Sequence, residues 1–167
     1  MSVFKHPNLK RYLTFSLIIV ILGILQVTFF DAIKIFWLKP DLLLISAVCA
    51  SLIFNPRAAL SFGIFAGIYK DSLTVSYFGM NTLLFSLWVF LLLKLSRKIS
   101  IEEDYLRLIL IFVIALLHNI IYGLIHLYFQ APVSPGIFLR IVILGSLYTT
   151  LLFPAVFKIS QIWTGQK

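Results

Sequence analysis

The chain has 167 residues, of which 61% are hydrophobic and only 12% are charged, and its formal net charge is +8. Soluble domains contain about 25% charged and about 45–50% apolar residues, so this composition excludes a soluble globular protein. Together with a mean hydropathy of +1.04, it predicts an all-α polytopic membrane protein, because helices satisfy their own backbone hydrogen bonds in lipid. At this length we expect a single integral membrane domain over residues 1–167.

Six apolar segments follow one another along the chain, and we expect each to form a helix. The first and fifth are long enough to cross a bilayer, which takes about 20 residues in a helix. The second and third are short, about 21 Å and 18 Å at 1.5 Å per residue, so they either span with flanking residues or enter the bilayer and return. Both alternatives leave the ends of the chain on the same side. The predicted segments are 12–30, 41–54, 58–71, 80–95, 106–129 and 137–157.

Lysine and arginine are unevenly distributed over the two sides that these six segments define. Ten lie on the side of the N-terminus and four lie on the other side. Because cytoplasmic loops carry the excess of positive charge, we expect both termini to be cytoplasmic. This topology and attraction to anionic lipid headgroups account for the net charge. No basic cluster is interleaved with aromatic residues, so we expect no nucleic-acid partner. We do expect the lipid bilayer to be a partner.

Gly63, Gly67 and Asp71 recur at intervals of four residues in the third segment. On a helix, each interval advances about 400°, so the three positions stay within about 80° on one face. The two glycines form a GxxxG surface on which another helix can approach closely. A carboxylate against lipid is costly, so Asp71 should face protein, water or the membrane interface.

The sequence leaves two roles open for Asp71. Its carboxylate could accept hydrogen bonds from the backbone N–H groups of Leu73 or Thr74 in the turn that follows, as short Asp side chains readily do. It could instead pair with Lys70, Arg140 or a cation of a partner protein. Arg140, four residues into the last segment, could also extend outward to the membrane interface. Of the two roles for Asp71, we favour the turn.

A second polar line follows the fifth segment, where His118, Tyr122 and His126 are again four residues apart and Asn119 adjoins the first of them. It could handle a proton or a ligand, or it could provide hydrogen bonds between helices, which is the common use of polar groups in membrane bundles. The two histidines lie about 12 Å apart along the helix and cannot share one metal ion.

The signatures of common enzyme classes are missing from the sequence. It contains no glycine-rich phosphate loop, no HExxH motif and no G-x-S-x-G elbow. We therefore expect no enzyme activity, no catalytic residue, no metal and no cofactor.

A Pro-Asp pair precedes an apolar run, the pattern G-x-x-x-G-x-x-x-D follows, and a glycine lies eight residues further on. In these features residues 40–79 resemble the rod shape-determining protein MreD family. The sequence departs from the family at Val75, where a glycine is frequent, and at Lys70, where an apolar residue is usual. The residues that carry the resemblance are Pro40, Asp41, Gly63, Gly67, Asp71 and Gly79.

The resemblance implies a non-enzymatic scaffold of the bacterial cell-elongation complex, which supports rod shape and peptidoglycan synthesis at the cytoplasmic (inner) membrane. The expected partners are MreC first, then the actin-like MreB, the glycosyltransferase RodA and its partner penicillin-binding transpeptidase. With the polar line of the fifth segment added, the candidate structural or partner-binding residues are Pro40, Asp41, Gly63, Gly67, Asp71, Gly79, His118, Asn119 and Arg140.

The resemblance also implies a fold like that of the substrate-binding S component of energy-coupling vitamin transporters. A vitamin-binding S component is therefore the alternative function. Such a protein needs a pocket near the outer leaflet, lined by converging polar and aromatic side chains. The outer loops offer Trp37, Asp71, Tyr77, Asn81, Tyr128 and Gln130.

Overall fold

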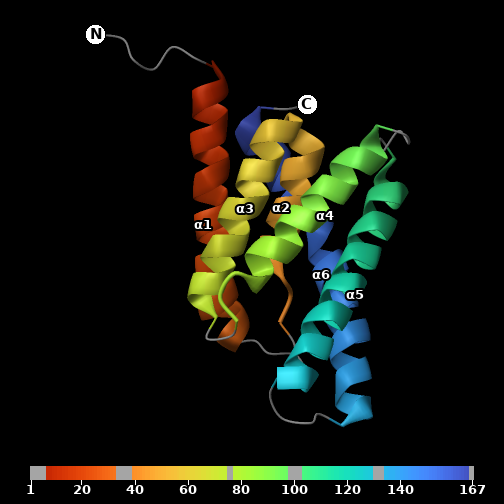
Figure 1. Cartoon of the computed structure of the whole chain (residues 1–167). Helices are drawn as coiled ribbons and strands as arrows, with labels where there is room; N and C mark the ends of the chain where they lie inside the picture. Colours follow the sequence, from red (N-terminus) through yellow and green to blue (C-terminus); the bar gives the residue numbers. More distant parts are fainter. Residues whose placement is uncertain (1–6, 33–38, 75–76, 98–102, 130–133, 166–167) are drawn as a thin grey trace.

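The computed structural model describes residues 7–32, 39–74, 77–97, 103–129 and 134–165, and these ranges contain six helices and no strand. The prediction of an all-α protein is therefore confirmed, and Figure 1 shows the six helices as one bundle. The helices are α1 (Pro7–Ala32), α2 (Leu42–Ile53), α3 (Pro56–Leu73), α4 (Met80–Ser96), α5 (Asp104–Phe129) and α6 (Pro135–Thr164).

The last helix differs most from its predicted segment. α6 continues to Thr164, past the expected end at residue 157, and it contains Pro154 in its interior. Helices of membrane bundles accept proline because neighbouring groups satisfy the freed carbonyl. The added turns are held against the bundle by small polar residues, since Ser160 and Thr164 are both buried.

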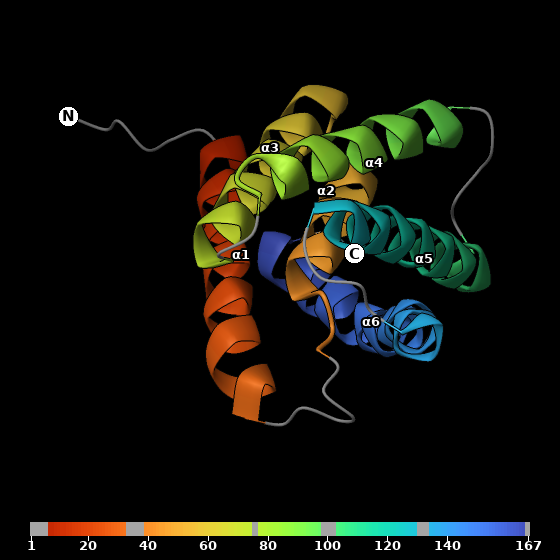
Figure 2. The same cartoon turned by 60° about the horizontal axis from the view of Figure 1, so that its bottom comes forward.

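Helix α2 forms the centre of the bundle. Eleven of its twelve residues are buried, and it contacts each of the other five helices, which surround it in Figure 2. Protein rather than lipid therefore covers its apolar side chains. This position explains why a segment too short for an ordinary transmembrane helix is nevertheless apolar on every face.

In the described part of the chain, three helices are long and apolar enough to cross a membrane. They are α1, with a span at Leu9–Thr28, α5 and α6. The outer face of α1 exposes large apolar side chains such as Leu13, Leu17 and Ile21, each more than two-fifths exposed. Exposed apolar side chains on spanning helices are the expected contacts of lipid tails. The chain is thus a polytopic helical membrane protein.

Helix α1 begins and α6 ends at the same end of the bundle, which we call the termini end (Figure 1). The connection from α2 to α3 also lies there, whereas the connection from α3 to α4 lies at the opposite end. Most described cations lie at the termini end, within two helical turns of a helix end or at its capping residue. These cations are Lys10, Arg11, Arg57, Lys94, Arg97, Arg107 and Lys158.

Candidate functional site

The two glycines of the GxxxG surface face α4. A Cβ atom added at Gly67 would lie 2.4 Å from the Cα of Thr82 and 2.8 Å from its nitrogen. At Gly63 an added Cβ would lie 2.8 Å from a methyl carbon of Val89. The backbones of α3 and α4 therefore approach more closely than any larger residue at position 67 permits. The helix contact predicted for Gly67 is confirmed.

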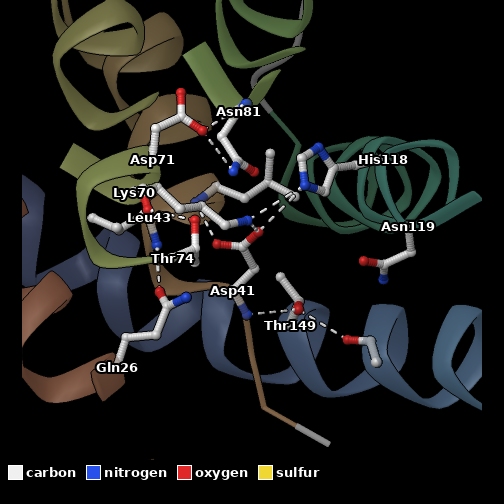
Figure 3. A network of polar contacts seen from close by, with 12 residues as sticks. Gln26, Asp41, Leu43, Lys70, Asp71, Thr74, Asn81, His118, Asn119 and Thr149 are labelled. Carbon is white, nitrogen blue, oxygen red and sulfur yellow. Dashed lines mark hydrogen bonds and ion pairs between the residues drawn. The ribbon is translucent and has the colours of Figure 1, made fainter. Parts of the chain in front are cut away.

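Asp71 continues this face and is almost fully buried, with 2% of its surface exposed. Its Oδ2 atom accepts hydrogen bonds from the backbone N–H of Gly79 (3.0 Å), from the backbone N–H of Thr82 (3.0 Å) and from the Thr82 hydroxyl (2.6 Å). Its Oδ1 atom accepts from the backbone N–H and the side-chain amide of Asn81, at 3.0 and 2.9 Å (Figure 3). One carboxylate thus holds the whole first turn of α4.

The capping residue of α4 is Gly79, which has no side chain to offer and adopts the left-handed conformation with φ of 92°. The first N–H groups of a helix need acceptors from outside the helix. Asp71 supplies them from α3, across the connection between the two helices. Glycine adopts a positive φ at little cost, which allows the chain to enter α4 directly above the carboxylate.

The turn role expected for Asp71 is correct in kind, but the expected donors are wrong. The N–H of Thr74 donates to the carbonyl of Lys70 at 3.1 Å, because α3 continues through Leu73 and keeps these groups within the helix. The alternative pairing of Asp71 with Lys70 is not observed, because Lys70 pairs with the carboxylate of Asp41 instead. Arg140 lies on the exposed part of α6, whereas the acceptor atoms of Asp71 are occupied by donors of α4.

Lys70 forms an ion pair with Asp41, the residue that caps α2. Asp41 Oδ1 accepts a hydrogen bond from the backbone N–H of Leu44 at 3.1 Å, and Oδ2 bonds the Lys70 ammonium. Only 12% and 13% of the two side chains are exposed, and the ammonium also lies 5.0 Å from the centre of the Phe85 ring. A charge pair in the interior of the bundle therefore joins α2 to α3.

His118 of α5 completes this group. Its Nε2 atom lies 3.4 Å from the Lys70 ammonium and 3.6 Å from Asp41 Oδ2, and only 2% of the residue is exposed. The ring lies 5.5 Å from that of Phe85 and 6.1 Å from that of Tyr122, measured between centroids. Its Nδ1 atom has no hydrogen-bond partner among the described residues.

Two further helices join through neutral groups. The backbone N–H of Asp41 donates to the hydroxyl of Thr149 in α6 at 3.0 Å, and the N–H of Leu43 donates to the side-chain oxygen of Gln26 in α1 at 3.2 Å. We call the resulting group the polar core, and Figure 3 shows how its side chains converge. It consists of Gln26 of α1, Asp41 at the cap of α2, Lys70 of α3, His118 of α5 and Thr149 of α6.

The remaining candidates lie around these two groups. Pro40 is buried beside Asp41. Asn119 donates to the hydroxyl of Ser146 at 3.0 Å, a hydrogen bond between α5 and α6 of the kind expected for this polar line. Of the predicted candidates, His118 and Asp41 lie together in the polar core. Asp71, Gly67 and Gly79 form a separate centre at the start of α4.

The described residues contain no group of three or more His, Cys, Asp or Glu side chains placed to hold a metal ion. The bonds of Asp71 join α3 to the start of α4, and most bonds of the polar core join the start of α2 to another helix. Such an arrangement fixes helix positions, which is its evident physical role.

Four of these partners lie outside the predicted structural or partner-binding residues, although Lys70 is a predicted alternative partner of Asp71 and Asn81 a predicted pocket residue. Lys70, Asn81, Thr82 and Thr149 all donate to or accept from a candidate residue. Asn81 and Thr82 follow Gly79 directly, so a signal existed: two polar residues at the start of an apolar helix. Thr149 gave no such signal, because a hydroxyl within an apolar run ordinarily donates its hydrogen bond to a carbonyl of its own helix.

A comparison with models of known protein families finds a match to the rod shape-determining protein MreD over residues 9–162. The chain belongs to the MreD family. The match begins in α1 and ends in α6, so the likeness extends over the whole bundle and well beyond the 40-residue motif. A search of curated proteins finds no match. A search of solved structures also finds none, and the expected likeness to vitamin-transporter S components stays a prediction.

Membership of the MreD family implies a role in the determination of rod shape, and this family is one of shape-determining membrane proteins rather than enzymes. The departure from the family pattern at Lys70 now has a local explanation, since the ammonium is the counter-ion of Asp41. The other departure, at Val75, lies outside the described residues.

Proposed function

We propose that this member of the MreD family is a non-enzymatic scaffold of the bacterial cell-elongation complex at the inner membrane. Its direct partner is MreC, and through the same complex it works with MreB, RodA and the penicillin-binding transpeptidase. The observation that carries this proposal is the family match over residues 9–162. In this function the bundle contributes a rigid surface to its partners and transforms no substrate.

The use of polar groups in the interior supports a scaffold. Buried charges in membrane helices ordinarily mark ion pathways, proton relays or ligand sites. Here Asp71 accepts from five donors at the start of α4 and its capping residue, and Asp41 and Lys70 neutralise each other between α2 and α3. These groups therefore stabilise one arrangement of helices.

The alternative of a vitamin-binding S component receives less support. Of the residues expected to line a pocket, Asp71 and Asn81 are buried and bonded to each other, and Tyr77 packs on Phe129 with 5.2 Å between ring centres. Trp37 and Gln130 lie outside the described residues. The groove between α5 and α6, lined by Asn119, Tyr122 and His126 among others, has a volume of about 230 Å³. Pockets for small molecules usually measure about 300–1,000 Å³.

The test is deletion of the gene in its bacterial host, with complementation by the wild-type protein. We expect rod-shaped cells to become round or swollen and to recover when the protein is restored. A tagged copy should retain MreC when the complex is isolated from detergent-treated membranes. Normal rods that have lost the uptake of one vitamin would instead establish the S component.

A further inference from the structure

A groove at the termini end runs between the start of α3 and the end of α4. Its volume is about 300 Å³, and its lining is apolar on one part and basic on the other. Pro56, Leu60, Phe90 and Leu93 form the apolar part, and Lys94 and Arg97 form the basic part. Lys94 and Arg97 lie at the end of α4, whereas Leu60 and Phe90 lie further along the two helices, toward the bilayer centre.

The two cations have no counter-ion from the described part of the protein. No ion pair joins Lys94 or Arg97 to a carboxylate there, and both residues are exposed. The positive end of α3 and the negative end of α4 also meet here, and their partial charges of about +0.5 and about −0.5 offset each other. Two full positive charges therefore remain at the mouth of an apolar groove.

A second basic groove, between α5 and α6, provides an informative contrast. It is larger, at about 380 Å³, and contains Arg107 and Lys158. However, Arg107 bonds Asp104 at 2.9 Å within the same groove and lies over the Phe157 ring. A carboxylate of the protein thus already offsets one of its two cations, which leaves the α3–α4 groove as the stronger attractor for an external anion.

We propose that the groove between α3 and α4 binds one anionic phospholipid. The phosphate group lies against Lys94 and Arg97, and an acyl chain follows Leu60, Phe90 and Leu93 along the groove. Basic pockets between transmembrane helices recognise anionic headgroups in this manner, through charge complementarity beside an apolar surface. The occupant is a lipid rather than a free phosphate ester, because more than half of the lining residues are apolar.

The experiment uses the purified full-length protein in a neutral detergent and measures retained lipid by native mass spectrometry. The probes are phosphatidylglycerol, phosphatidylcholine and glycerol phosphate at equal concentrations. We expect phosphatidylglycerol to be retained and phosphatidylcholine to be lost. The double variant Lys94→Gln, Arg97→Gln should bind phosphatidylglycerol about thirty-fold more weakly, as two cations at a membrane surface imply.

A matched control removes the same charge from the same end at a distance from the groove. Lys10→Gln with Lys158→Gln should bind phosphatidylglycerol as wild type does. The charge-preserving swap Lys94→Arg, Arg97→Lys should restore binding. Thermal unfolding in lipid-free detergent shows that the helices remain folded. Equal retention of the two lipids, equal loss in the control variant, or displacement by glycerol phosphate would each overturn the proposal.

Discussion

The Oδ2 atom of Asp71 accepts both hydrogen bonds that Thr82 can donate, from its backbone N–H at 3.0 Å and from its hydroxyl at 2.6 Å. One helical turn earlier, Gly67 lies against the backbone of the same threonine. The glycine permits the close approach and the carboxylate makes use of it, since a larger residue at 67 would hold α4 out of reach. Gly67, Asp71 and Gly79 therefore encode one structural unit, the junction of α3 and α4, whereas Asp41 of the same motif belongs to the polar core.

The first prediction concerns the charge of Asp71. Asp71→Ala removes all five acceptor contacts, and Asp71→Asn replaces one acceptor oxygen by an amide that faces N–H donors. Because unsatisfied buried groups and lost helix caps each cost about 1–2 kcal/mol, we expect both variants to lose at least about 2 kcal/mol of stability. Thermal unfolding in detergent measures the loss. Asp104, whose side chain is 92% exposed, provides the control, and Asp104→Asn should unfold as wild type does.

An Asp71→Asn variant as stable as wild type would contradict this account. It would mean that a neutral amide accepts the hydrogen bonds of the N–H groups at the start of α4 and that the negative charge contributes nothing to stability.

The second prediction concerns the close approach at Gly67. Gly67→Ala places a Cβ atom 2.4 Å from the Cα of Thr82, so α3 and α4 must separate, and overpacking of this kind costs about 1–3 kcal/mol. At Gly136, in the first turn of α6, an added Cβ meets nothing within 4 Å. Gly136→Ala should therefore be neutral or slightly stabilising, since alanine favours helix. Protein yield and the unfolding temperature report both effects; equal effects of the two substitutions would show that the α3–α4 contact is unimportant.

The sequence predicts the helices and the glycine face well because both depend on local periodicity. Six apolar runs yield six helices, and Gly63, Gly67 and Asp71 share a face because four residues nearly complete a turn. The pairing of Lys70 with Asp41 could not be predicted in the same way. These residues are 29 positions apart, and their meeting depends on how α2 and α3 cross, which no local pattern specifies.

Asp41 itself illustrates the same limit. The sequence places it directly before an apolar run, and in the structure its carboxylate caps α2. Its backbone N–H also bonds Thr149, 108 residues further on. This contact follows only from the central position of α2. The donors to Asp71 were missed for a related reason, since α3 continues further than the turn reading assumed.

The third prediction concerns topology. Helix α1 begins and α6 ends at the termini end, where most described cations lie, and positive charge is retained on the cytoplasmic side. A reporter active only in the cytoplasm should work when fused to either terminus, and one active only in the periplasm should fail at both. A C-terminus that supports the periplasmic reporter would require an odd number of crossings and would contradict the arrangement.

The final prediction concerns the ion pair in the polar core. Lys70→Met leaves Asp41 as a buried carboxylate without its cation, and breaking a buried pair from one side typically costs about 3–5 kcal/mol. Asp41→Asn leaves the ammonium unpaired, with a similar cost. In the double variant neither charge remains, so we expect a total loss clearly below the sum of the single losses, and unfolding of all four proteins in one detergent measures the coupling. Additive losses would mean that each side chain acts through separate contacts, Asp41 through its cap on α2 and Lys70 through Phe85, and that the charge pair does not join α2 to α3.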